Sequence, residues 1–315
     1  MKKVIGSVAV SLGLALSASA WAADYPTKSI DVVVPSSAGG GNDTFIRALQ
    51  PLLEEQFGEN LVIRNIAGGG GAVGMTRVAA LEPDGYTVLA ASNAMLTLEA
   101  MGSVSFTRDD FDFIAKVIEE PYVIAVSGDS QYQDLEGLID AAASGETVQI
   151  GVSGIGSSAH IAAVAMANSA GVELNIVPYP GGSETISAVM GGHIEGLVLG
   201  GAELRSALQS GRLNALAITY DERSASLPEV PTFQEKGYDL TLTVWRGIAA
   251  PKGLPPEVAE RWVAALEQIV ADGSYEETAA NLGTELAPLY GEELAAFIED
   301  SAEVMRDAAG DLARE

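Results

Sequence analysis

The chain has 315 residues and carries 43 acidic against 17 basic side chains, which gives a net charge of −26. This negative charge excludes nucleic acid and anionic membrane surfaces as natural partners. The sequence has no cysteine, so disulfides, thiolate catalysis and lipid attachment to an N-terminal cysteine are excluded as well. Hydrophobic residues make up 48% of the chain, which is enough to build the cores of two ordinary domains.

Residues 1–22, MKKVIGSVAVSLGLALSASAWA, have the features of a signal peptide for export. Two lysines precede a short apolar run, and small residues then lead to Ala20-Trp21-Ala22, which is an A-x-A cleavage site. The apolar run is short for a membrane span, which argues against an N-terminal anchor. We therefore predict cleavage of a Sec signal between Ala22 and Ala23 and a periplasmic location.

Apolar runs alternate with amphipathic stretches along most of the remaining chain. Strands are predicted in eight runs: IDVVVPS, NLVIRNI, YTVLAAS, YVIAVSG, TVQIGVS, LNIVPY, IEGLVLG and LNALAITY. Helices are predicted at residues 42–57, 74–80, 135–143, 158–170, 183–190 and 203–209. This alternation predicts an α/β fold with a mostly parallel sheet and helices on both of its faces.

The last third of the chain has a different pattern. The stretch ERSASLPEVPTFQEKGYD is rich in proline and polar residues, so we interpret it as a crossing segment outside the core. After it, PPEVAERWVAALEQIVADG predicts an amphipathic helix with proline at its start and glycine at its end. The stretch EELAAFIEDSAEVMRDAAG predicts the final helix.

Four of the predicted strands end in turns of small residues and glycine: SSAGGGND, IAGGGGAVG, SGIGSSAH and YPGGSE. In open α/β sheets, ligands bind at the carboxyl ends of strands. Two of these turns lie in the first hundred residues and two in the middle of the chain. This distribution predicts two lobes that each contribute two turns to one cleft.

A nucleotide is a poor candidate for the ligand of these turns. Neither AGGGND nor AGGGGAVG has the lysine that a phosphate-binding P-loop requires. GGGGAVG can be aligned with the dinucleotide-binding glycine pattern, but it follows the second predicted strand and is an isolated match. An exported protein also rarely meets NAD or ATP.

Hydrolysis is the second alternative. His160 follows Gly-Ser-Ser-Ala at a predicted helix start, so an exported hydrolase using His160 is conceivable. However, the sequence contains no G-x-S-x-G nucleophile elbow and no histidine and glutamate spacing suited to zinc. We interpret His160 as a packed residue at a helix terminus and His193 as a surface residue of a turn.

The remaining chemistry is noncovalent capture of a small anion. Glycine turns bring backbone N–H groups close to a ligand because no Cβ intervenes. Hydroxyl groups are added by Ser36, Ser37, Ser157 and Ser158. A carboxylate accepts such hydrogen bonds well. Taken alone, however, each of these turns is also compatible with an ordinary connection between a strand and a helix that binds nothing.

At this point the sequence resembles the substrate-binding proteins of tripartite tricarboxylate transporters, the TctC or Bug family. The resemblance covers nearly all of the chain after residue 22, and the order and spacing of its motifs carry it. These motifs are YPTKSIDVVVPSSAGGGND, RNIAGGGGAVGMTRVAALEPDGYTV, GIGSSAHIA, VPYPGGSETISAVMGGHIEGLV, SGRLNALAITYDERSASLPEVPTFQEKGY and WRGIAAPKGLP.

The resemblance implies a bilobed periplasmic-binding-protein fold of the type II kind, with two α/β domains joined by hinge strands around a central cleft. Lobe I is expected to comprise residues 23–120 and 224–315, and lobe II residues 121–223. The strands near Val123 and Ala217 would form the hinge, and the lobes would close on the ligand.

The resemblance also implies which residues bind the ligand, since the family's loops cradle a carboxylate. In lobe I the matching residues are Ser36, Ser37, Ala38, Gly39, Gly40, Asp43, Ala67, Gly68, Gly69 and Gly70. In lobe II they are Gly154, Gly156, Ser157, Ser158, Tyr179 and Gly181. We interpret Asp43 as a helix-capping and loop-bracing residue, because a bare carboxylate would repel the ligand.

This sequence departs from the family pattern at four positions that affect the cleft. Ser36 replaces a frequent aromatic residue, and Pro180 replaces a frequent cation. Arg246 replaces a frequent aromatic residue, and it either binds a second carboxylate or forms a salt bridge within its lobe. Glu195 stands where the family tends to have aspartate, and it either holds a ligand hydroxyl or caps the structure.

Together these observations predict a periplasmic receptor that binds a di- or tricarboxylate and delivers it to the permease subunits of a tripartite tricarboxylate transporter. It is expected to be a monomer without enzymatic activity, cofactor or metal-ligating residues, and the sequence leaves open whether the acid binds as a metal complex. A receptor of the same fold that presents its closed form to a sensor kinase is the alternative that the sequence leaves open.

Overall fold

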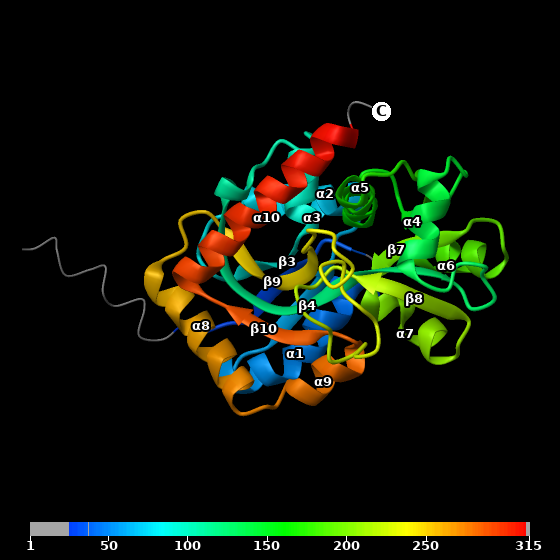
Figure 1. Cartoon of the computed structure of the whole chain (residues 1–315). Coiled ribbons are helices and arrows are strands. Elements are labelled where there is room, and N and C mark those ends of the chain that lie inside the picture. The colour runs from blue at the N-terminus through cyan, green and yellow to red at the C-terminus, as the bar shows by residue number, and fades with distance from the viewer. Residues whose placement is uncertain (1–24, 37, 313–315) are drawn as a thin grey trace, which may run out of the picture.

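The computed structural model describes residues 25–36 and 38–312, without the side chains of the last two (Figure 1). The predicted signal peptide and Ser37 therefore lie outside the described residues. Two bodies are visible, with α1, α8 and α9 in one and α4, α6 and α7 in the other. The predicted bilobed α/β fold is confirmed.

The first body is built on one half of a mixed sheet, in which the strands follow the order β2-β1-β3-β9-β4. The bounds of these strands and of β10, which also pairs with β4, are β1 (Ile30–Val34), β2 (Leu61–Asn65), β3 (Thr87–Ser92), β4 (Phe111–Ser127), β9 (Thr243–Pro251) and β10 (Glu285–Leu289). The pairs β1–β2 and β1–β3 are parallel, whereas β9 and β10 run antiparallel to their partners.

The long strand β4 continues into the second body. Its residues up to Pro121 pair with β9, and those from Tyr122 onward pair with β7 and β8. The strands of this half are β5 (Gln149–Ser153), β6 (Asn175–Tyr179), β7 (Gly196–Gly200) and β8 (Leu213–Ile218). Because one strand serves both halves, the two bodies are joined through continuous backbone hydrogen bonding.

The helices cover the faces of these half-sheets. Those of the first body are α1 (Gly41–Phe57), α2 (Ala72–Ala79), α3 (Ala94–Ala100), α8 (Pro256–Ala271), α9 (Glu276–Leu282) and α10 (Gly291–Leu312), with the short 3-10 segments η1 (Gly69–Gly71) and η2 (Arg108–Asp110). Those of the second body are α4 (Leu135–Ala143), α5 (Ser158–Ala170), α6 (Gly182–Met190) and α7 (Gly201–Gln209).

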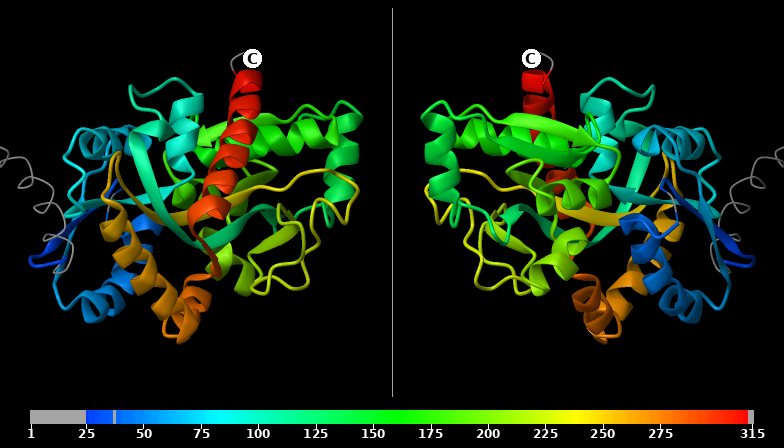
Figure 2. Two further views of the ribbon diagram at one scale, coloured as in Figure 1. Left: turned by 90° about the vertical axis from the view of Figure 1, so that its left-hand side faces the viewer. Right: turned by 90° about the vertical axis from the view of Figure 1, so that its right-hand side faces the viewer.

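Two apolar cores stabilise this arrangement. One lies within the first body, where the buried face of α1, including Phe45 and Leu49, packs with Trp262 of α8. The other extends from the opposite face of the first half-sheet into the second body, and it includes Met305 of α10 together with Ile161 of α5. Figure 2 shows α10 lying across the boundary between the bodies, where it contacts both α3 and α5.

The prediction of a mostly parallel sheet is wrong. Strands β4 and β9 cross the molecule and make antiparallel pairs with β3, β7, β8, β10 and each other. All eight predicted strands are present, and the predicted helices at 135–143 and 158–170 match α4 and α5. Helices α3 and α9 and strands β9 and β10 were not predicted.

Among the residues that the structure describes, no helix combines the length and the apolar character needed to cross a bilayer.

Candidate functional site

A cavity of about 390 Å³ lies between the two bodies, where the carboxyl ends of strands from both meet. This volume is within the usual range for small-molecule sites. Four turns line it: those after β1, β2, β5 and β7. Further lining comes from the end of β3 and from Tyr122 of β4 and Arg246 of β9.

Six of the predicted site residues line this cavity: Ser36, Ala67, Gly68, Gly70, Ser158 and Arg246. The structure places eleven others outside its lining: Ala38, Gly39, Gly40, Asp43, Gly69, Gly154, Gly156, Ser157, Tyr179, Gly181 and Glu195. The last predicted residue, Ser37, lies outside the described residues.

The turn after β1 leads into α1, whose first residue, Gly41, lines the cavity. Gly40 precedes the helix in an extended conformation, and no side chain caps it. The backbone N–H groups at this end of a 17-residue helix therefore remain available to an anion.

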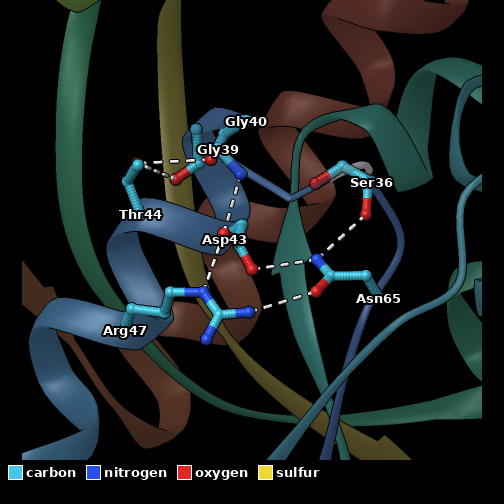
Figure 3. Close-up of polar contacts among 8 residues, drawn as sticks. Ser36, Gly39, Gly40, Asp43, Thr44, Arg47 and Asn65 are labelled. Atoms are coloured by element: carbon cyan, nitrogen blue, oxygen red, sulfur yellow. Dashed lines mark hydrogen bonds and ion pairs between the residues drawn. The ribbon is translucent and has the colours of Figure 1, made fainter.

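Asp43 holds this turn in place from behind (Figure 3). It is 2% exposed, and its Oδ2 accepts hydrogen bonds from the Gly39 N–H (2.8 Å) and Arg47 Nε (2.9 Å). Its Oδ1 accepts from Asn65 Nδ2 (2.9 Å), which also donates to the Ser36 carbonyl (3.2 Å). The predicted loop-bracing contacts are therefore present, although Asp43 does not cap α1 through its side chain.

Burial opposes ionisation of Asp43, but the hydrogen bonds from Arg47, Gly39 and Asn65 outweigh it and lower the pKa of this carboxyl. Because the pKa in the folded state is lower than in the unfolded state, the charge on Asp43 stabilises the fold above the ordinary pKa of 3.8. This contribution is lost as the pH falls through the folded-state pKa.

We expect Asp43→Ala to destabilise the protein by about 1–3 kcal/mol at pH 7, because the partners of Asp43 lose their acceptor. The difference from wild type should shrink as the pH falls below about 4. Urea unfolding of both proteins at pH 7 and pH 3.5 measures this difference in the free energy of unfolding. A difference that stays constant between these pH values would contradict the assignment to the ionised carboxylate.

The turn after β2 has a backbone that requires glycine. Gly68, Gly69, Gly70 and Gly71 have φ angles of 133°, 56°, 66° and 107°, which side-chain-bearing residues rarely adopt. Gly71 also packs closely on the first turn, since a Cβ at this position would lie 3.1 Å from the Pro35 carbonyl oxygen. The two lobe I turns therefore form one preorganised wall of the cavity.

In the second body, the turn after β5 is braced by its own side chains. Ser157 Oγ accepts a hydrogen bond from the His160 N–H (3.1 Å), and His160 Nδ1 accepts one from the Gly156 N–H (3.0 Å). His160 thus holds the turn that presents Ser158 to the cavity, and it does not itself line the cavity. This geometry favours the structural interpretation of His160 over the hydrolase alternative.

The turn after β6 lies elsewhere. Tyr179, Pro180 and Ser183 line a separate open hollow that also contains His193. Glu195 accepts a hydrogen bond from the Gln149 N–H (2.8 Å), which belongs to the first residue of β5. Glu195 therefore lies at the amino end of β5, whereas the cavity lies at the carboxyl ends.

The two bodies meet at Tyr122, which lines the cavity. Its hydroxyl accepts a hydrogen bond from Asn93 Nδ2 (2.7 Å) and also bonds with the Ser158 side chain. Burial raises the pKa of Tyr122 far above its ordinary value, so the hydroxyl remains protonated. A single side chain thus links the end of β3 in one body with the start of α5 in the other.

Arg246 of β9 lines the cavity as a nearly buried cation. Its Nη1 donates to Glu120 Oε1 (2.7 Å), and Glu120 Oε2 accepts from the Ala202 N–H at the start of α7. The guanidinium also packs on the first residue of α1, because a Cβ built on Gly41 would lie 2.4 Å from Nη2. The salt bridge within lobe I is therefore present, and Arg246 still faces the cavity.

Sequence reasoning missed Gly200 and Glu203 as cavity-lining residues. The signal was present, because the predicted strand IEGLVLG ends in a glycine and is followed by GAE, which together form a further glycine turn. Ser92 and Asn93 at the end of β3 were missed as well, since the SNA that follows that strand contains no glycine.

A bilobed α/β fold with a cavity between the lobes, at the carboxyl ends of their strands, defines a protein of the periplasmic solute-binding class. The model of the tripartite tricarboxylate transporter family receptor, TctC, matches residues 45–309. The chain belongs to this family, which confirms the resemblance predicted from its motifs.

Relatives and solved structures agree with this assignment. Protein BugT of Bordetella pertussis is 30% identical over 262 residues, covering 81% of this chain and 79% of its own. A TctC solute-binding protein from Polaromonas, solved without ligand, has a TM-score of 0.80 at 30% identity, covering 91% of this chain and 99% of its own. The malate-bound MatC of Rhodopseudomonas palustris has a TM-score of 0.77 at 23% identity, covering 90% of this chain and 100% of its own, and so shows the fold alone.

Proposed function

We propose that this protein captures a small organic acid in the cavity between its lobes and delivers it to the permease of a tripartite tricarboxylate-type transporter. The acid's first carboxylate binds at the start of α1 and the Gly68–Gly71 turn, where backbone N–H groups converge. The observation that carries the proposal is the guanidinium of Arg246 packed on Gly41 at this same helix end.

Charge explains why such a site is needed. The chain has a net charge of −26, so an anion is repelled at long range and must be attracted locally. Neutral backbone donors and one cation provide this attraction without exposing a positive surface. The family and the acid-bound structural neighbour, MatC with malate, support an organic acid as the ligand class.

The proposal includes export and closure. Residues 1–22 act as a cleaved Sec signal, and the mature protein works in the periplasm as a monomer without enzymatic activity. Lobe I comprises residues 23–120 and 224–315, and lobe II residues 121–223, with the hinge near Val123 and Ala217. Closure around these strands buries the acid, and the closed form docks on the permease.

A thermal-shift screen of residues 23–315 tests the proposal. The panel contains malate, adipate, succinate, citrate and benzoate, with NAD and ATP as controls. An acid at a hundredfold excess over its Kd should stabilise the protein by about 2.7 kcal/mol and raise its melting temperature. A shift with a nucleotide and none with any acid would refute the proposal.

A further inference from the structure

The cavity contains a carboxyl group that a receptor for anions would not be expected to present. Glu203, in the first turn of α7, lines the cavity on the lobe II side. Its Oε2 lies against the start of α6, because a Cβ built on Gly182 would be 2.1 Å away. Glu203 and Arg246 are the two charged residues among those that line the cavity.

The start of α7 is already occupied by another acid of the chain. Glu120 accepts a hydrogen bond from the Ala202 N–H and pairs with Arg246. Its carboxyl group also packs beneath Gly200, where a Cβ would lie 3.2 Å away. The start of α7 is therefore not available to an incoming anion.

Three elements contribute groups that face Glu203. Glu120 of β4 repels its charge and Arg246 of β9 attracts it, while α6 contributes the backbone of Gly182. Glu203 is exposed as a whole residue, but its carboxyl end lies against Gly182 at the cavity wall, and only that end is shielded from solvent. The pKa of Glu203 is raised to about 6, mainly by burial of the carboxyl group and secondly by the negative charge of Glu120.

The cavity is thus asymmetric. Its lobe I end attracts a carboxylate, whereas its lobe II end carries a carboxylate of its own. We propose that capture of a dicarboxylate is coupled to uptake of one proton from solvent, which is then shared between Glu203 and the ligand's distal carboxylate. Two carboxyl groups in one site cannot both remain ionised at close range, whereas a protonated one donates a strong hydrogen bond to the other.

This inference rests on the proposed function, and it makes Glu203 a residue that determines specificity. Because Glu203 loses its proton above about pH 6, the affinity of the wild-type protein for a dicarboxylate should fall by up to about tenfold per pH unit between pH 6 and pH 8. The proton belongs to the pair, so the midpoint observed with ligand present describes both groups together.

The experiment is isothermal titration calorimetry with adipate and malate at pH 6, 7 and 8. Glu203→Gln keeps the shape of the side chain and carries a permanent N–H donor. It should bind both acids with an affinity that changes much less with pH, and at pH 8 it should bind them at least about tenfold more tightly than wild type does. The ligand's own ionisation is the same for both proteins, so their difference isolates Glu203.

A matched control is Glu184→Gln, which removes a negative charge from α6 outside the cavity lining. It should keep the pH dependence of the wild type. Titrations at pH 8 in two buffers with different ionisation enthalpies should show about one proton taken up per adipate by the wild type and almost none by Glu203→Gln.

Each contrary result has a distinct meaning. A wild-type affinity for dicarboxylates that is constant from pH 6 to pH 8, or binding confined to monocarboxylates such as benzoate, would overturn the inference and leave the proposed function intact. An affinity that rises with pH and is lost in Glu203→Gln would overturn it by indicating a cationic ligand group. If neither protein bound any acid detectably, both the proposed function and the inference would be refuted.

Discussion

Replacing Glu120 with alanine is expected to lower the free energy of unfolding by about 3 kcal/mol. Glu120 is 1% exposed, and its removal leaves the guanidinium of Arg246 as an uncompensated, nearly buried cation. The Ala202 N–H loses its acceptor in the same variant. This expected loss lies at the lower end of the range for breaking a buried ion pair, because the cavity lets water reach Arg246. Urea unfolding at pH 7.5 measures the change.

Two further variants make this result interpretable. Arg64→Ala breaks a salt bridge with Asp31 in which Arg64 is 54% exposed, so it should destabilise the protein far less than Glu120→Ala does. Glu120→Ala combined with Arg246→Met removes both charges and should recover most of the loss. If Glu120→Ala destabilised the protein no more than Arg64→Ala, the burial of this ion pair would contribute nothing to stability.

Replacing Gly41 with alanine is expected to weaken binding of the tightest acid in the thermal-shift screen by about 10- to 100-fold. The new Cβ would lie 2.4 Å from Arg246 Nη2, which is closer than real contacts allow, so the guanidinium must move away from the start of α1. A charge-assisted hydrogen bond to the ligand, which contributes about 1.5–3 kcal/mol, would be lost. Calorimetric titration of both proteins measures the change.

The matched control is the same substitution at Gly310 in α10. Among the described residues, no atom outside the helix backbone and the two chain neighbours lies within 4 Å of a Cβ built at that position. Gly310→Ala should therefore leave the affinity unchanged and stabilise the helix by about 0.5–1 kcal/mol. Equal affinities of wild type and Gly41→Ala would show that Arg246 does not contact the acid.

Local sequence patterns were sufficient to locate most elements of the fold. The apolar run and glycine turn that become β1 and the start of α1 are signals within one short stretch. The antiparallel crossing was not predictable in this way, because β4 pairs with β9 across large sequence separations, as in Phe111 with Pro251. Strand direction depends on such distant partners, so alternation alone suggested too many parallel pairs.

The same distinction applies to the site. The glycine turns were recognisable from composition. Which of the lobe II turns face the cavity, however, is set by the packing of the whole lobe. Tyr179 and Glu195 therefore lie away from the cavity even though they match family positions. The pairing of Arg246 with Glu120 joins residues 126 positions apart, which no local pattern could reveal.

The position of α10 constrains how the chain reaches its native state. This helix follows every other described element in the sequence, yet Leu294, Ile298 and Met305 belong to the core shared with the second body. In a chain that emerges N-terminus first, that core stays incomplete until α10 has emerged. Nascent or truncated chains that lack it therefore expose the apolar surfaces of α3 and α5, which makes them natural substrates for chaperones and proteases.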